Sequence, residues 1–333
     1  GSDLSRIRTH AQEKKGSWRI SGEKIFISGG GQDLSEGILH LVLARTGKPD
    51  TGVKGLSLFL CPSHIDGTEN SVAVVRLEDK LGLHASPTCH MHFADAEAAL
   101  VGKEGEGLKA MFTMMNYART DVALQGVGHA SRAHQIALEY ASTREQGRTS
   151  SGQAAVLTDH ADVRQMLDKQ ANLALGGRAM CHITIARTLP GTSQELTDIL
   201  ASLCKVFCSE ASTTAADLGI QILGGYGYLH EYGMEQIWRD ARITSIYEGA
   251  NGIHARALAT RGFQHKETKE LFVSFISSLF DDKTLADPAI SQWQEESETI
   301  LNSESPELEA NNLMNITTNL FLQACQSRMN FDG

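Results

Sequence analysis

The sequence has little positive charge for its length, and this excludes one large class of functions. Its 333 residues include 30 Lys and Arg against 40 Asp and Glu, which gives a formal net charge of -10 and a pI of about 5.7. A nucleic-acid-binding surface needs a basic patch or stripe. We therefore expect small-molecule ligands or protein partners, and no nucleic acid.

Long apolar runs are missing as well. No segment approaches the roughly 20 apolar residues of a membrane-spanning helix, and the first residues lack the charged, apolar and small-residue regions of a signal peptide. The chain begins at Gly1 without Met, and its first residues resemble sequence from the interior of a domain. We expect a fragment or a truncated product, in which Gly1 and Ser2 could also be a cloning remnant.

The six cysteines and thirteen histidines form no metal-binding or redox motif. No CxxC, zinc-ligand spacing or HExxH occurs, and His90 and His92, on one face of a predicted strand, are a weak metal signal. Cys204 and Cys208 share a helix face, where we expect two small core residues. Scattered free cysteines favour a reducing compartment, such as the bacterial cytoplasm or, in a eukaryote, the mitochondrial matrix.

Motifs of phosphate-binding and nucleophilic enzymes are also absent. The glycine-rich stretches "SGGGQD" (28–33), "GEGL" (105–108) and "QILGGYGYLHEYG" (221–233) lack the Gly-Lys-Ser/Thr of a P-loop. None lies in the strand–turn–helix context of a dinucleotide fold, and no GxSxG occurs. We expect these stretches to form turns or helix caps.

The sequence does contain, first, a series of short strands over residues 1–97. "SWRISGEKIFISGG" (17–30) has two apolar runs around Ser21-Gly22, a hairpin signal. "HLVLART", "GLSLFLCP", "VAVVRL" and "CHMHFAD" come next, each bounded by Gly, Pro, Asp or Ser. Because no helix separates them, they predict an antiparallel sheet, sandwich or barrel and exclude a doubly wound fold.

The hydrophobic period then changes to that of helices. Apolar residues three and four apart predict helices over about 108–143, 159–189 and 194–223, the second ended by Pro190-Gly191 and the third by Gly224-Gly225. A shorter helix, with a break near Glu248, is expected over 245–261. Compact turns between these helices predict a bundle over residues 98–262.

Residues 263–333 are acidic and Ser-rich. "ELFVSFISSLF" (270–280) is amphipathic, Pro288 and Pro306 interrupt the next stretch, and "EANNLMNITTNLFLQACQSRMN" (309–330) predicts another helix. The expected fold is therefore α+β: an antiparallel β-barrel middle domain, an α-helical bundle, and an appended helical extension that is incomplete.

One carboxylate draws attention in "ITSIYEGANGIH" (243–254). Apolar or aromatic neighbours flank Glu248, so we expect it to be buried. A buried carboxylate is costly unless it is paired, protonated or used. From the residues alone, a solvated loop glutamate and a catalytic base both remain open.

Taken together, these segments resemble the acyl-CoA dehydrogenase superfamily over residues 1 to about 262. The resemblance is carried by "GSD" at the start, "GEKIFISGG" (22–30), "DKLGLHASPTCHMHFAD" (79–95), "QILGGYGY" (221–228) and "IYEG" (246–249). The likeness is strongest to the long bacterial 3-methylmercaptopropionyl-CoA dehydrogenase-like subgroup, whose extra helices after the bundle would account for residues 263–333. The family's amino-terminal helical domain is missing.

The resemblance implies a reaction for Glu248. It would take a proton from the α-carbon of an acyl-CoA, while the β-carbon passes a hydride to FAD, leaving a trans-2-enoyl-CoA. The thioester oxygen would be held by the flavin ribityl hydroxyl and the Glu248 backbone amide as charge develops. Burial would then suit the base to its task.

The resemblance also implies contacts for other residues. Arg144 and Gln146 match a region that reaches the FAD pyrophosphate, and the Gln221–Gly225 loop closes over its adenosine part, both often from a neighbouring subunit. Two departures concern FAD contacts: Ala250 replaces a threonine and Gly252 a glutamine. The full set is, for the cofactor, Phe26, Ser28, Arg144, Gln146, Gln221, Gly224 and Gly225, and for the substrate, Ser2, Ser86, Arg119, Tyr247 and Gly249.

The implied partners are acyl-CoA, electron transfer flavoprotein, and further copies of the chain in a homodimer or homotetramer. Two alternatives stay open. An acyl-CoA oxidase would pass the electrons to oxygen, and a truncated, non-catalytic relative would be only a folded module. Without the amino-terminal domain, which forms one wall of the substrate pocket, the base would be exposed to water.

Overall fold

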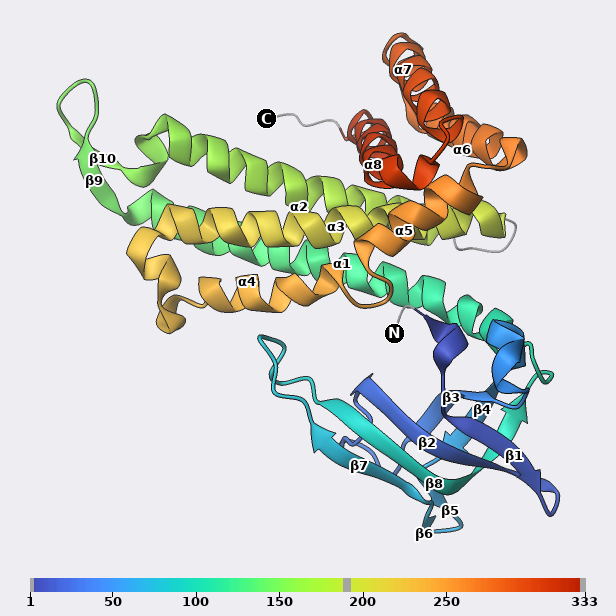
Figure 1. Cartoon of the computed structure of the whole chain (residues 1–333). Coiled ribbons are helices and arrows are strands. Elements are labelled where there is room, and N and C mark those ends of the chain that lie inside the picture. The colour runs from blue at the N-terminus through green and yellow to red at the C-terminus, as the bar shows by residue number, and fades with distance from the viewer. Residues whose placement is uncertain (1–2, 188–192, 330–333) are drawn as a thin grey trace. The chain divides into compact units, whose positions relative to one another are not determined.

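The computed structural model describes residues 3–187 and 193–329. It divides into two compact units, Gly1–Met115 and Asn116–Gly333. The first unit is built on a sheet and the second is helical (Figure 1).

The first unit contains a six-stranded sheet. Its strands are β1 (His10–Lys14), β2 (Ser17–Ser28), β3 (Leu39–Arg45), β4 (Leu56–Pro62), β7 (Val72–Leu77) and β8 (Thr88–Val101). They lie in the order β2-β1-β3-β4-β8-β7, and β2 also pairs with β8. The neighbours are antiparallel except β1 and β3, which run parallel where His10 pairs with Arg45. The sheet is therefore mixed, and the predicted antiparallel barrel is not confirmed.

The predicted hairpin at Ser21-Gly22 is wrong. β2 runs through these residues, and the β1–β2 turn lies at Lys15-Gly16, both with positive φ. Gly22 instead follows a bulge in the pairing with β8 and has φ +130. A Cβ there would lie 2.8 Å from Thr9 Cα, so glycine permits a close approach inside a long strand.

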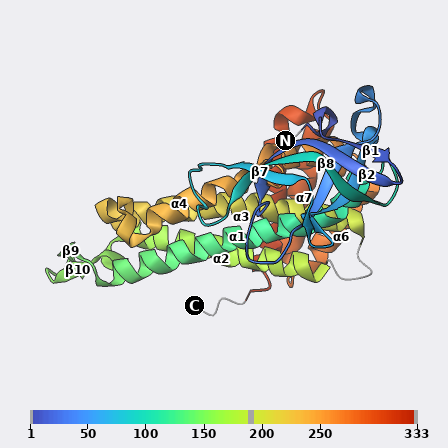
Figure 2. The same cartoon turned by 90° about the horizontal axis from the view of Figure 1, so that it is seen from below.

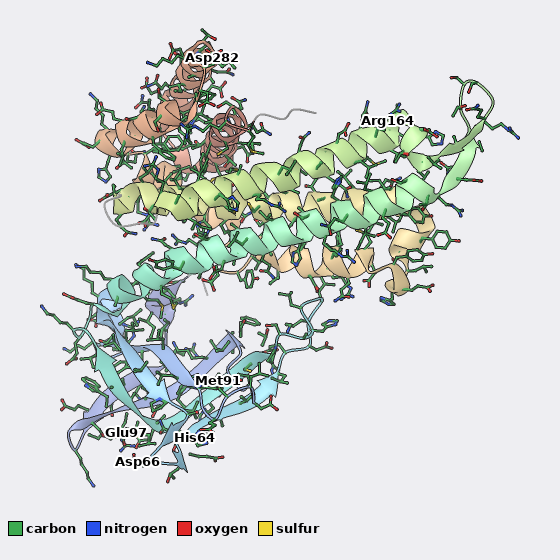
Figure 3. All side chains as sticks on the ribbon, turned by 180° about the vertical axis from the view of Figure 1, so that it is seen from behind. His64, Asp66, Met91, Glu97, Arg164 and Asp282 are labelled. Carbon is green, nitrogen blue, oxygen red and sulfur yellow. The ribbon has the colours of Figure 1, made fainter. Side chains whose placement is uncertain are left out.

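The sheet encloses a core of alternating strand residues, as the period of two requires. Ile20, Phe59 and Met91 are among its fully buried side chains. Figure 3 labels Met91 on β8, and it also labels His64 and Asp66 in the small hairpin formed by β5 (His64–Ile65) and β6 (Thr68–Glu69).

In the second unit the predicted long helices are confirmed. α1 (Gly107–Thr143), which starts in the first unit, continues beside α2 (Ala161–Arg187) and α3 (Gln194–Leu223), as Figures 1 and 2 show. The predicted end of the second helix lies outside the described residues. A hairpin of β9 (Glu145–Arg148) and β10 (Ala154–Val156) joins α1 to α2.

The segment after α3 differs from the prediction. Gly224 caps α3 with φ +60, as expected, but α4 (Met234–Arg242) was not predicted. The expected helix over 245–261 is replaced by a 3-10 turn at Ile243–Ser245, α5 (Asn251–Ala257) and a π-turn at Leu258–Gly262. The break therefore falls at residues 246–250, around Glu248.

The extension consists of α6 (Lys266–Leu279), α7 (Lys283–Leu301) and α8 (Ala310–Gln326). It shares one core with α2, α3 and α5, in which the rings of Phe263, Phe272 and Trp293 have centroids 5.3 to 5.4 Å apart. Pro288 does not interrupt the chain as predicted, because α7 runs through it. Figure 3 labels Asp282, which caps α7, and Arg164 on α2.

None of the described helices is both long and apolar enough to span a membrane.

Candidate functional site

The turn that carries Glu248 has an unusual backbone. Glu248 has φ +53 and Gly249 has φ +91, so two consecutive residues lie in the left-handed region. For a residue with a side chain this conformation costs roughly 1–2 kcal/mol. Such strain persists only where surrounding contacts determine it, and these sites are often functional.

Two buried side chains supply those contacts. Lys205 of α3 donates to the Gly249 carbonyl (2.7 Å), and the Nε2 of His254 on α5 lies 3.1 Å from the Glu248 carbonyl oxygen. Asn251, the first residue of α5, joins the network by accepting from Lys205 (2.9 Å) and donating to Ser209 Oγ (3.1 Å). Both carbonyls of the turn are therefore fixed from the core.

The proton on His254 can be placed from its partners. Burial, followed by the charge of Arg119, lowers the pKa of His254 to about 4, so the ring is neutral at pH 7. The Glu248 carbonyl only accepts, so Nε2 carries the hydrogen and donates it. Nδ1 then accepts from Ser202 Oγ, 3.3 Å away.

The Glu248 carboxylate itself is unengaged. Within the described part of the chain it forms no hydrogen bond or ion pair, and the backbone N–H of Glu248 has no acceptor there either. The side chain is half-buried, so the expected full burial is not found in this unit. A free carboxylate beside a free amide is a base next to a hydrogen-bond donor.

Arg119 lies near this carboxylate. Its Nη1 donates to Asn116 Oδ1 (2.9 Å), while its buried Nε has no partner among the described residues. Burial lowers the pKa of Arg119, and the charges of Asp198 and Glu248 act in the opposite direction. A buried donor without an acceptor suits a polar ligand group at this place.

Tyr247 precedes the base and points to α1. Its hydroxyl donates to Gln125 Oε1, and burial raises the pKa of Tyr247. The hydrogen bond ties the turn to α1 as well as to α3. Tyr247 and Gly249, both predicted substrate contacts, therefore flank Glu248 as the sequence requires.

The predicted cofactor residues of this unit gather at one end of the bundle. The Arg144 guanidinium lies 5.6 Å from the ring centroid of Tyr226, which follows Gly224 and Gly225. Gln221 is exposed in the last turn of α3, and Gln146 is exposed on β9. Arg119, which lies near Glu248, is about 24 residues from the end of α1, a separation of roughly 35 Å at 1.5 Å per residue. The predicted cofactor residues at that end therefore do not reach Glu248 within one copy of the chain.

The remaining predicted residues belong to the first unit. Phe26 has φ +60 and is 69% exposed on β2, and Ser28 ends that strand, paired with Thr88. Ser86 is exposed in the loop before β8. Ser2 lies outside the described residues.

These residues fit a bound FAD in their chemistry. An exposed aromatic ring beside a hydroxyl, as at Phe26 and Ser28, can stack on a flavin and hydrogen-bond to it.

The residues that the structure describes give no support to a metal centre. The described residues contain no group of three or more His, Cys, Asp or Glu that could hold an ion. His90 and His92 both face Glu23, at 3.3 and 3.9 Å. Cys204 and Cys208 are buried free thiols in the core, as predicted.

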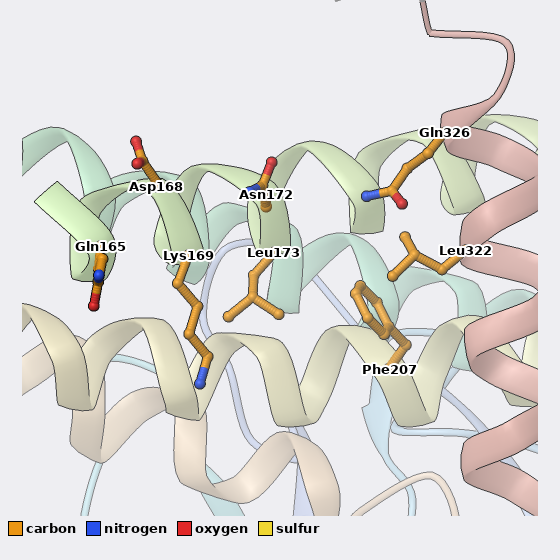
Figure 4. A pocket seen from close by; sticks show the side chains of 8 residues that line it. All are labelled: Gln165, Asp168, Lys169, Asn172, Leu173, Phe207, Leu322 and Gln326. Carbon is orange, nitrogen blue, oxygen red and sulfur yellow. The ribbon is translucent and has the colours of Figure 1, made fainter.

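A separate pocket of about 350 Å³ lies between α2, α3 and α8 (Figure 4). Lys169 and Leu173 of α2, Phe207 of α3, and Leu322 and Gln326 of α8 line it. It does not include Glu248, and it contains no cluster of catalytic groups.

Sequence reasoning missed Lys205, His254, Asn251 and Gln125. Lys205 and Gln125 contact the turn from distant elements, which the sequence does not display. Asn251 and His254 lie on α5 directly after the turn, but their contacts depend on how α5 packs. One signal was present: Lys205 is a lone basic residue in the apolar stripe "LASLCKVFC" (200–208), where a lysine needs a buried partner.

Two family models match the chain: "Acyl-CoA dehydrogenase, middle domain" over residues 1–96 and "Acyl-CoA dehydrogenase, C-terminal domain" over residues 105–263. The chain is 45% identical over 280 residues to 3-methylmercaptopropionyl-CoA dehydrogenase of Ruegeria pomeroyi, covering 78% of this chain and 48% of that protein. It is 36% identical over 286 residues to the broad-specificity linear acyl-CoA dehydrogenase FadE5 of Mycobacterium tuberculosis, covering 77% and 47%.

Among solved structures, Caenorhabditis elegans ACDH-11 in complex with C11-CoA matches with a TM-score of 0.81 at 24% identity, covering 98% of this chain and 59% of that one. This likeness concerns the fold and includes the extension. The chain spans about half the length of the curated relatives it matches.

Proposed function

The chain belongs to the acyl-CoA dehydrogenase family, and from that premise we propose that it performs the α,β-dehydrogenation of an acyl-CoA thioester to a trans-2-enoyl-CoA. Family members are FAD-dependent flavoproteins. In this proposal residues 1–97, 98–262 and 263–333 form the middle domain, the dehydrogenase bundle and its extension.

Glu248 is the proposed base, and the free carboxylate in a fixed turn is the observation that carries this proposal. A base must have an acceptor oxygen that no other protein group occupies, and the Glu248 carboxylate meets this condition within the described chain. The held backbone limits where the carboxylate can point. It would take the proton from the carbon next to the thioester carbonyl.

Removing that proton places negative charge on the thioester oxygen. The N–H of Glu248 has no acceptor within the described residues, so it can donate to this oxygen. Fixed donors aimed at developing charge contribute strongly in a water-poor site. The positive charges of Arg119 and Lys205 lie near the same turn. They would stabilise the negative charge that develops on the thioester oxygen.

FAD, when bound, supplies the acceptor for the hydride that leaves the β-carbon. Phe26 and Ser28 would contact the flavin, and Arg144, Gln146, Gln221, Gly224 and Gly225 would hold the distal part of the cofactor. Their separation from Glu248 along the bundle supports a cofactor shared between copies in a homodimer or homotetramer. Ser2, Ser86, Arg119, Tyr247 and Gly249 would contact acyl-CoA.

Electron transfer flavoprotein is the proposed redox partner, and oxygen is the alternative acceptor. The test is to load the chain with FAD and add short, medium and sulfur-containing acyl-CoAs without air. Loss of flavin absorbance supports the proposal, and the rate of reoxidation in air separates a dehydrogenase from an oxidase. A colourless protein that retains no FAD and is not reduced would favour a non-catalytic module.

A further inference from the structure

Lys205 is a buried charge without a charged partner. It is 0% exposed in the middle of α3, and its amine donates to two neutral oxygens, Gly249 O and Asn251 Oδ1. No carboxylate of the described residues lies within ion-pair distance of it. Burying an ammonium costs several kcal/mol unless its contacts compensate. The fold therefore retains this lysine against a free-energy penalty.

Its two contacts lie directly after the proposed base. Gly249 directly follows Glu248, and Asn251 opens α5. Asn251 is itself bound to α3, because its Nδ2 donates to Ser209 Oγ (3.1 Å) and Glu210 Oε1 (3.0 Å). Without the amine, the Gly249 carbonyl would lose its donor, and the left-handed backbone would lose one of the two contacts that oppose its strain.

The amine is also placed to be charged at neutral pH. Burial lowers the pKa of Lys205 to about 8, the Glu248 charge raises it, Arg119 lowers it, and Glu210 raises it. The groups that face the amine are thus Glu248 from the turn, Arg119 from α1, Glu210 from α3 and His254 from α5, which is neutral above about pH 4.

We propose that Lys205 is a positioning residue for proton abstraction: its ammonium fixes the Gly249 carbonyl and so keeps Glu248 in the left-handed conformation that aims its carboxylate. This inference rests on the proposed function for its catalytic part. Its structural part, the control of the turn by the amine, can be tested separately.

The first test compares Lys205→Met with Lys205→Gln in the FAD-loaded chain. Methionine fills similar space without a donor, whereas glutamine retains a neutral N–H. A misplaced base typically costs on the order of 100-fold in rate, so we expect Lys205→Met to lower kcat by about 100-fold with KM little changed. Lys205→Gln should recover part of this loss. Lys266→Met, which removes an exposed lysine of α6, is the control and should leave kcat unchanged.

An unchanged kcat in Lys205→Met would overturn the inference. So would equal losses in Lys205→Met and Lys205→Gln together with a raised KM and a lower melting temperature, because that pattern indicates only a lost support for α5. If Lys205→Met does not fold, the kcat of Lys205→Gln decides: the inference requires it to lie below that of the wild type with KM little changed.

The second test does not depend on turnover. A crystal structure of either variant should show Glu248 outside the left-handed region or the turn displaced from α3, and a wild-type φ at Glu248 in both variants would contradict the inference. If wild type fails to reduce flavin while the turn moves as expected, the proposed function fails and the positioning role stands.

A pH series adds a readout of the charge. The folded pKa of about 8 lies below the ordinary value of 10.5, so the unfolded chain binds more protons between these values and stability rises with pH across that window. Lys205→Met should lack this contribution. Burial also lowers the pKa of Lys24 to about 8, but Lys24 is present in both wild type and Lys205→Met. The difference between their two stability profiles therefore reports Lys205 alone. Identical pH profiles would contradict a buried ammonium.

Discussion

Two turns in the helical unit contain a residue with almost the same positive φ, and the residue differs between them. Gly224, after α3, has φ +60, and Glu248, before α5, has φ +53. Gly224 has no side chain to strain, and its backbone N–H donates a hydrogen bond to Gln221 O that completes the cap. At Glu248 a residue with a side chain has a similar positive φ, and Lys205 and His254 hold the carbonyls of Gly249 and Glu248.

The two turns carry different backbone strain because they serve different purposes. A helix cap needs only a change of direction, so glycine is sufficient. A base needs a carboxylate, and the turn then needs contacts from the core to keep it in place. Substitutions in the two turns and in their supporting residues test this contrast.

The largest expected effect is on turnover. Glu248→Gln keeps the size of the side chain and the φ angle but removes the base, so kcat should fall by roughly 10²- to 10⁴-fold. The FAD content and the melting temperature should stay as in wild type. Steady-state kinetics and flavin absorbance measure both; turnover at the wild-type rate would remove Glu248 from the role of base.

A second effect concerns acid stability. The pKa of His254 is about 4 in the fold and 6.5 ordinarily, so the unfolded state binds more protons between these values. This contribution to stability is complete above pH 6.5 and is lost as pH falls to about 4, on the order of 3 kcal/mol. His254→Gln, whose amide can still donate to Glu248 O, should flatten this acid limb in urea unfolding.

His265→Gln is the matched control, because His265 is an exposed residue at the start of α6. It should leave the acid limb intact. An equal flattening in both variants would mean that His254 is not a buried neutral ring.

A third effect distinguishes Gly249, in the Glu248 turn, from Gly252, in α5 directly after it. A Cβ at Gly249 would lie 2.7 Å from His254 Nε2, and its φ is +91. We expect Gly249→Ala to destabilise the chain by about 1–3 kcal/mol. Gly252→Ala meets nothing within 4 Å inside α5 and should stabilise by about 0.5–1 kcal/mol. Chemical denaturation of both variants checks the opposite signs.

The smallest effect belongs to the other turn. Gly224→Ala meets no atom within 4 Å but places a Cβ at φ +60 and ψ -136, a sparsely populated conformation, so it should cost about 1 kcal/mol. Gly225→Ala, with open space and no positive φ, should stay within about 0.5 kcal/mol of wild type. If Gly224→Ala cost as much as Gly249→Ala, the contrast between the two turns would fail.

Parts of the molecule governed by local pattern were predictable. α3 runs from Gln194 to Leu223 as expected, because its apolar stripe has the helical period and a glycine pair follows it. Most strands also lie where short apolar runs predicted them. The hairpin at Ser21-Gly22 failed because Gly22 serves a close approach to Thr9, and glycine signals both turns and such contacts alike.

The site was predictable only in its residue types. The "IYEG" resemblance pointed to Glu248, and the loop break around it follows from two consecutive left-handed residues. The supports were not predictable: Lys205 reaches a carbonyl 44 residues further along the chain, and that contact depends on how α3 packs on the turn. Pro288 inside α7 is a similar case, since tertiary packing overrides a local helix-breaking signal.

The central claim is that Glu248 removes the α-proton, and hydrogen exchange tests it without requiring net oxidation. The FAD-loaded chain is incubated in ²H₂O with an acyl-CoA in which sulfur replaces the β-carbon, and mass spectrometry follows deuterium at the α-carbon. Wild type should exchange this hydrogen, and Glu248→Gln should do so at least about 100-fold more slowly. Equal exchange by both proteins would contradict the account.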